Sequence, residues 1–190
     1  MMAYMPFGSL WLPVLVSAAL VWIASAIVWM ALPHHKTDFR KLPSEDGLVD
    51  ALRKLALKPG QYLMPFMPDM KNMKDPAVVK RFEDGPIAMI NVRPNGMPGM
   101  GKNLAAYFAY CVLVSFVTAY VARHTLTPGT ARADVFRMTG TIAIASYTLA
   151  LIPESIWMWR PWTATWKSVC DSIVYGILTG AVFAALWPHP

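Results

Sequence analysis

The chain has 190 residues, of which 56% are hydrophobic and only 15% are charged, with a formal net charge of +6. This composition excludes an ordinary soluble domain, and the basic residues are not gathered on one soluble module as nucleic-acid binding requires. They suit loops that face anionic lipid headgroups. We predict an all-α membrane protein with four transmembrane helices and a small α+β extramembrane domain between helices 1 and 2.

The first predicted span covers residues 8–32, which carry no charge. At the α-helical rise this run exceeds the roughly 30 Å hydrocarbon thickness of a bilayer. A signal peptide would carry a basic n-region and a shorter apolar run of about 7–15 residues. Because no Lys or Arg precedes the run, we expect a retained helix.

Three further spans are predicted over residues 103–122, 138–158 and 169–187. The second is uncharged between Lys102 and Arg123, and the fourth contains only Asp171 near its start. The third passes through Pro153 and Glu154 before it reaches spanning length.

Residues 33–102 form the predicted extramembrane domain, since a loop of this length is too long for a mere connection. Ser44 precedes an amphipathic pattern, GLVDALRKLAL, that predicts a capped helix, and Asp75 with Pro76 predicts the start of a second. Residues 87–92 have the composition of a strand. A domain of this size is marginal alone, so we expect it to lean on the membrane surface or on a partner.

Four tryptophans lie at and just beyond the end of the third span, and amphipathic rings of this kind sit at the depth of lipid headgroups. The predicted interface anchors are Trp157, Trp159, Trp162 and Trp166. Lys and Arg residues near the ends of the spans are more numerous on the side of the large loop. The positive-inside rule assigns that side to the cytoplasm. We therefore expect a multi-pass protein of the bacterial inner membrane, with residues 33–102 cytoplasmic.

A methionine recurs at every third position in Met64, Met67, Met70 and Met73. Thioether sulfur suits Cu(I), so a copper-binding or copper-transfer membrane protein is one hypothesis. Pro65 and Pro68 prevent a regular helix, and methionine also suits irregular membrane-facing or partner-facing surfaces. We favour packing over copper, and no other cofactor is expected.

Glu154 is an ionisable residue within a predicted span, which by default suggests a function in proton or cation handling. With Arg160 as its partner, it supports a third hypothesis, a small transporter or channel. The competing interpretation is that Pro153 and Glu154 begin the exit from the bilayer.

The remaining polar groups have ordinary explanations. Cys111 and Cys170 lack CxxC spacing and indicate neither a disulfide framework nor a zinc site. Asp171, in the first turn of the fourth span, would complement the helix dipole. His34 and His35 could ligate a metal, but a polar pair at the membrane interface is the commoner explanation.

Small residues recur along one face of the fourth span at Gly176, Gly180 and Ala184, a pattern typical of closely packed helices. The chain has no HExxH, GxSxG or paired catalytic carboxylates, so we do not expect an enzyme. The leading hypothesis is a noncatalytic accessory or interaction subunit. Its expected partners are the lipid bilayer and other membrane subunits or further copies of itself, and no nucleic acid.

Overall fold

The structure, a computed structural model, describes residues 5–67, 69–97 and 99–189, without the side chains of Phe7 and Met70. The chain divides into two compact units. The first is a helical bundle built from residues up to 39 and from 99 onward, and the second comprises residues 40–98.

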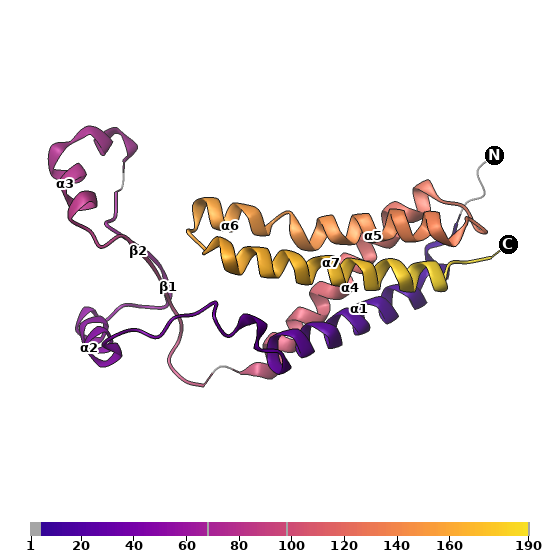
Figure 1. The fold of residues 1–190 in the computed structure, drawn as a ribbon, viewed down its shortest axis with the longest axis horizontal. Coiled ribbons are helices and arrows are strands. Elements are labelled where there is room, and N and C mark those ends of the chain that lie inside the picture. Colours follow the sequence, from indigo (N-terminus) through magenta and orange to yellow (C-terminus); the bar gives the residue numbers. More distant parts are fainter. Residues whose placement is uncertain (1–4, 68, 98, 190) are drawn as a thin grey trace. The chain divides into compact units, whose positions relative to one another are not determined.

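The bundle consists of five helices and the turns beside them (Figure 1). They are α1 (Trp11–Ala26), α4 (Met100–Thr125), α5 (Arg132–Thr148), α6 (Leu151–Trp157) and α7 (Trp162–Ala185). A 3-10 turn, Phe7–Leu10, precedes α1, and a π-helical turn, Ile27–Ala31, follows it.

Four helical segments are long and apolar enough to cross a membrane. They are Gly8–Ala31, Met100–Thr125, Arg132–Trp157 and Trp162–Ala185. The predicted fold class is therefore confirmed at the level of a mostly helical chain with four such helices and a small two-stranded sheet.

Three of these helices begin earlier than the sequence patterns indicate, α4 by less than one turn and the other two by more than one turn. Helix α5 begins at Arg132 and α7 at Trp162, whereas the uncharged runs begin at 138 and 169. A charged side chain does not end a helix as long as it can reach water or a partner, so an uncharged run underestimates helix length. Asp171 consequently lies inside α7 rather than in its first turn, and the helix-dipole explanation for it is wrong.

The third segment is broken between α5 and α6, at Leu149 and Ala150. Pro153 lacks a backbone N–H, and its ring would collide with the carbonyl group of Leu149 in a continuous α-helix. The break therefore lies about one turn before Pro153, where a proline disrupts an α-helix. Helix α6 nonetheless continues alongside α7, as Figure 1 shows.

Helix α7 is the central element of the bundle, since 44% of its most apolar window is buried, against 28% for each of the other three segments. It meets α5 through glycines. A Cβ added to Gly176 would lie 2.8 Å from the backbone nitrogen of Ile144, and one added to Gly180 would lie 3.0 Å from the Cα of Gly140. Ala184, one turn after Gly180, is partly buried against a core cluster that includes Phe183 and Trp187.

Helices α1 and α4 are joined by polar contacts inside an apolar interface. Ser17 Oγ donates to Ser115 Oγ at 3.0 Å, and Trp22 Nε1 donates to the carbonyl of Leu104 at 3.0 Å. Such bonds satisfy polar groups that an apolar environment would leave unpaired. The core around them contains Ala18, Val21, Cys111, Val114, Ala143, Tyr147 and Tyr175.

The second unit contains α2 (Glu45–Leu55), β1 (Gly60–Met64), a 3-10 turn (Met70–Lys74), α3 (Pro76–Asp84) and β2 (Ala88–Val92). The two strands pair antiparallel (Figure 1), and their register runs from Gly60 opposite Val92 to Met64 opposite Ala88.

Local signals of the second unit have mixed outcomes. As predicted, Asp75 caps α3, because its Oδ1 accepts the N–H of Ala77 at 2.8 Å. Ser44 stands at the start of α2 but makes no side-chain capping bond there. Strand β2 lies within the predicted 87–92, whereas β1 has no counterpart among the predicted elements.

The second unit has almost no core of its own. Of its described residues, only Pro65 is buried. Its exposed large apolar side chains are Leu42, Leu48, Leu55, Leu63, Met64, Phe66, Met73, Val79, Ile87 and Met97. A unit this open gains little stability from burial within itself.

Candidate functional site

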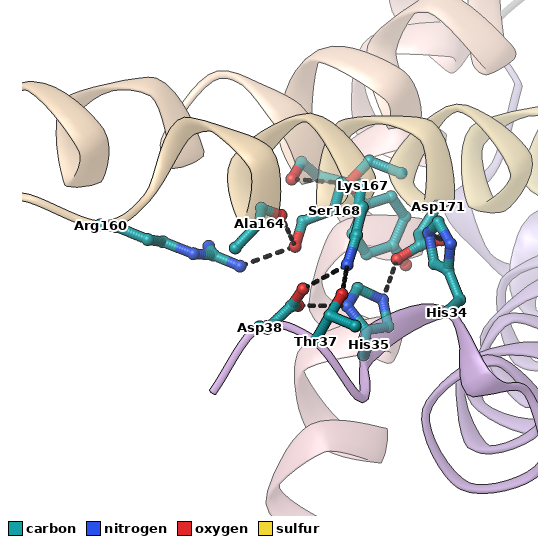
Figure 2. A network of polar contacts seen from close by, with 11 residues as sticks. His34, His35, Thr37, Asp38, Arg160, Ala164, Lys167, Ser168 and Asp171 are labelled. Atoms are coloured by element: carbon teal, nitrogen blue, oxygen red, sulfur yellow. Dashed lines mark hydrogen bonds and ion pairs between the residues drawn. The ribbon is translucent and has the colours of Figure 1, made fainter. Parts of the chain in front are cut away.

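A polar cluster forms where the chain that follows α1 meets α7 (Figure 2). The 3-10 turn Pro33–His35 brings both of its histidines against α7. From α7, Lys167 and Asp171 project toward the same segment, because residues four apart share one face of a helix. The cluster therefore joins residues that are more than 130 positions apart in the chain.

His35 is the centre of the cluster and is only 5% exposed. Its Nδ1 lies 2.6 Å from Asp38 Oδ2, and its Nε2 lies 2.7 Å from Asp171 Oδ2. Both ring nitrogens of His35 therefore face a carboxyl group, one from Asp38 and one from Asp171. The ring of Trp29 stacks on His35 with a centroid distance of 3.8 Å and an interplanar angle of 4°, which fixes its orientation.

Asp38 is held on both sides. Its side chain is 6% exposed, and Lys167 Nζ donates to its Oδ1 at 2.7 Å and to Thr37 Oγ1 at 2.7 Å. Burial by itself would raise the pKa of Asp38, but the hydrogen bonds and positive charges of Lys167 and His35 outweigh it and lower that pKa below its ordinary value. Asp38 is therefore a carboxylate at neutral pH.

His34 completes the cluster from its open side. Its Nε2 lies 3.5 Å from Asp171 Oδ1, and its side chain is 38% exposed. The two oxygens of Asp171 thus face two different imidazole rings. The three groups, His34, His35 and Asp171, place one ligand atom each within 4.8 Å of one another.

The turn between α6 and α7 positions Arg160 (Figure 2). Trp159 adopts a left-handed conformation, φ 53°, which a bulky residue rarely takes, and reverses the chain there. The guanidinium of Arg160 then reaches Ser168, donating to its Oγ at 2.7 Å. The ion pair predicted between Glu154 and Arg160 is not formed. Within the described chain, the exposed Glu154 carboxylate has no ion-pair partner. The two residues are joined through the backbone instead, because the Arg160 N–H donates to the Glu154 carbonyl at 3.3 Å.

A cavity of about 670 Å³ adjoins the polar cluster within the bundle. Its walls are mainly aromatic and aliphatic, and its polar lining includes Arg160, Ser168 and Asp171. The lining residues are Ser25, Ala26, Trp29, Met30, Met100, Asn103, Leu104, Tyr107, Tyr110, Tyr147, Leu151, Arg160, Ser168, Asp171, Ser172 and Tyr175.

Four tyrosines run along this cavity as a chain of ring contacts. Tyr107 meets Tyr110, Tyr110 meets Tyr147, and Tyr147 meets Tyr175, each at a centroid distance of 5.8 Å. The hydroxyls of Tyr147 and Tyr175 are buried and make no hydrogen bond of regular geometry within the described residues, although the Cys111 thiol lies near the first and the Trp29 indole near the second. Buried polar groups are normally paired, so these two hydroxyls remain able to donate to a molecule beside them.

The methionine series lies in the second unit, apart from this cluster. Met64 ends β1, Met67 lines a smaller cavity of about 90 Å³ together with Phe66 and Phe82, and Met73 is 55% exposed in a 3-10 turn. The side chain of Met70 lies outside the described part of the structure. Copper binding by this series stays a prediction.

The four tryptophans predicted as interface anchors lie around the turn that carries Arg160. Each is about half exposed or more, and the rings of Trp162 and Trp166 are 6.2 Å apart. Their placement at a membrane interface stays a prediction.

Sequence patterns did not indicate the roles of Asp38 and Lys167. One signal could have found the α7 side of the cluster: Lys167 and Asp171 form an (i, i+4) pair of charges within an apolar helix, where ionisable residues are expensive and functional. That signal is visible only if the helix is known to begin before Lys167. Asp38 offers no comparable signal, because its partners are distant in the chain.

The comparisons with protein-family models, curated proteins and solved structures find no match for this chain. The geometry of the cluster and of the cavity is therefore the basis for a function.

Proposed function

We propose that the chain is a multi-pass membrane protein that holds a small amphiphilic molecule in the tyrosine-lined cavity of its helical bundle. The observation that carries the proposal is a cavity of about 670 Å³ lined by four tyrosines, among which the buried hydroxyls of Tyr147 and Tyr175 make no hydrogen bond of regular geometry. Ligand sites of this size, largely apolar with a few convergent polar groups, are typical of small-molecule binding.

The polar groups define the head of the molecule. Tyrosine hydroxyls and the Arg160 guanidinium donate hydrogen bonds, so the head must offer acceptor oxygens. Leaving a buried donor unpaired costs about 1–3 kcal/mol, and a ligand oxygen that accepts from it recovers much of this.

The walls of the cavity define the apolar part of the bound molecule. Water could satisfy the two hydroxyls, but it gains nothing from the rings of Trp29, Tyr107 and Tyr110 that line the cavity. An apolar or planar body does, because it is removed from water and packs on aromatic faces. An amphiphile with oxygen acceptors at one end fits both requirements.

Two classes of membrane molecule share this chemistry: a quinone, through its ring carbonyls, and a glycerolipid, through its ester carbonyls. Their probes are decylubiquinone and dihexanoyl phosphatidylglycerol. Binding of each to the purified full chain in nanodiscs is measured by the rise in melting temperature and by saturable quenching of tryptophan fluorescence. We expect saturable binding of at least one probe, and the arm that responds identifies the source.

Two kinds of variant sharpen the test. Tyr147→Phe removes a hydroxyl that makes no hydrogen bond of regular geometry, so it should leave the free protein equally or more stable while weakening probe binding by roughly three- to tenfold. Ala26→Phe should block the cavity, whereas Ala106→Phe adds the same ring at an exposed position of α4 and serves as its control. The proposal is rejected if neither probe saturates, or if Ala26→Phe binds as well as Ala106→Phe.

Other functions predicted from the sequence stay predictions: the accessory-subunit role, Cu(I) binding, transport through Glu154 and the cytoplasmic side of the loop. The apolar residues that the second unit leaves exposed are the structural feature that favours an accessory role.

A further inference from the structure

We propose that His34, His35 and Asp171 together bind a divalent transition-metal ion at the polar cluster. This proposal does not depend on what occupies the cavity, because it concerns three side chains that face one another beside it. Imidazole nitrogen and carboxylate oxygen are the ligands that Zn²⁺ and Fe²⁺ take in two-histidine, one-carboxylate sites.

The spacing of the ligand atoms suits one ion. A tetrahedral ion with bonds of 2.0–2.1 Å holds its ligand atoms about 3.3 Å apart. His34 Nε2 lies 3.5 Å from Asp171 Oδ1, and His35 Nε2 lies 2.7 Å from Asp171 Oδ2. With one ligand atom from each residue, all within 4.8 Å of one another, an ion requires small movements of the two histidines, and any proton on His35 Nε2 leaves to solvent.

The surroundings of His35 are those of a metal ligand. Metal-bound histidines usually donate their other ring N–H to a carboxylate, which fixes the tautomer and orients the ring. Asp38 occupies this place, 2.6 Å from Nδ1, and Lys167 in turn holds Asp38 at 2.7 Å. Stacking on Trp29 prevents rotation of the ring.

His34 distinguishes a metal site from a simple clamp between the two segments. A clamp needs only His35, Asp38, Lys167 and Asp171, which already satisfy one another. His34 adds one long polar contact to Asp171 and an edge-on contact with the ring of His35, and its side chain is 38% exposed. As a third ligand it has a clear role, and with three protein ligands the ion keeps an open position, as catalytic and ligand-binding metal sites do.

The test measures Zn²⁺ binding to the full chain in nanodiscs, purified through a tag without histidine and treated with a chelator beforehand. Equilibrium dialysis followed by elemental analysis gives stoichiometry and affinity, and Co²⁺ absorption in the visible range reports the ligand geometry. We expect one ion per chain and a higher melting temperature when Zn²⁺ is added, because an ion that binds only the folded state stabilises it.

The variants separate ligands from neighbours. His34→Gln should weaken Zn²⁺ binding at least tenfold while leaving the metal-free melting temperature unchanged. Asp38→Asn should weaken it about tenfold through the orientation of His35. His189→Gln, an exposed histidine away from the cluster, is the matched control and should bind as the unchanged protein does.

The result for His34 decides the proposal even where a change at Asp171 prevents folding. Absence of saturable Zn²⁺ and Co²⁺ binding overturns it. Equal Zn²⁺ affinity of the His34→Gln and His189→Gln proteins also overturns it, and leaves the cluster as a clamp made of ion pairs.

Discussion

In the polar cluster each acidic side chain faces at least one basic side chain. Asp38 and Asp171 are two buried carboxylates, and His35 and Lys167 are the groups that bond to them. Removing one partner of a buried pair leaves the other charge desolvated and unpaired, which is more damaging than losing an exposed pair. The cluster therefore ties the 33–39 segment to α7 only while it is complete.

We predict that Lys167→Met lowers the free energy of unfolding by about 2 kcal/mol, because Asp38 then keeps only His35 as a partner. The double change Lys167→Met with Asp38→Asn should cost less than the sum of the two single changes, as expected for groups in direct contact. The measurement is unfolding of the purified full chain by titration with a denaturing detergent.

Arg137→Met is the control for this cycle. Arg137 pairs with Asp134 at 3.4 Å on α5, and both side chains are more than half exposed. An exposed pair of this kind contributes less than about 1 kcal/mol. Additive effects of Lys167→Met and Asp38→Asn would contradict the assigned contact.

At the scale of single residues, the sequence indicates which polar residues are unusual in an apolar chain. It does not indicate which of them contact one another. The apolar run that begins at 169 predicts a helix-dipole role for Asp171, whereas α7 begins at Trp162. His34 and His35 were recognised as able to ligate a metal. Their partners depend on how α1 and α7 pack, and no local pattern carries that information.

Helix α7 organises the bundle at the scale of elements. It packs against α1, α5 and α6 and contributes Lys167 and Asp171 to the cluster and Tyr175 to the cavity. Its approach to α5 is close because glycines stand at the contact, as in other helix pairs with small residues at their interface.

We predict that Gly176→Ala lowers the free energy of unfolding by about 2 kcal/mol. The added Cβ would collide with the side chain of Ile144 and lie 2.8 Å from its backbone nitrogen, so α5 and α7 must separate. The same detergent titration measures this change.

Gly101→Ala is the matched control, because nothing lies within 4 Å of a Cβ added at this glycine of α4. It should be neutral or slightly stabilising, since alanine restricts the unfolded chain more than glycine does. Equal stability of the two variants would mean that Gly176 does not face α5 as described.

Elements were predictable to the extent that they follow apolar periodicity and local chain chemistry. The apolar runs predicted four helices of spanning length, and Asp75 with Pro76 predicted the start of α3. The early starts of α5 and α7 were missed because their first turns are polar. Strand β1 was missed because a five-residue strand is defined mainly by its pairing with β2.

At the scale of the whole molecule, the bundle explains why so apolar a chain can be a stable protein. Many large apolar side chains on α1 and α4 point outward, including Leu12, Ile23 and Leu113. In water these surfaces would promote aggregation, whereas in lipid they are the expected outer face of a bundle. The amphiphile proposal and the membrane proposal therefore depend on the same four crossings.

Single-cysteine labelling of intact membranes tests these crossings most directly. In a background with Cys111 and Cys170 replaced by alanine, cysteines are placed at Ser44, Met158, Thr130 and His189 and exposed to an impermeant maleimide. Four crossings predict that Ser44→Cys and Met158→Cys are labelled from one side of the membrane, and Thr130→Cys and His189→Cys from the other. Labelling of all four from the same side, or recovery of the chain in the soluble fraction without detergent, would contradict the membrane-spanning bundle.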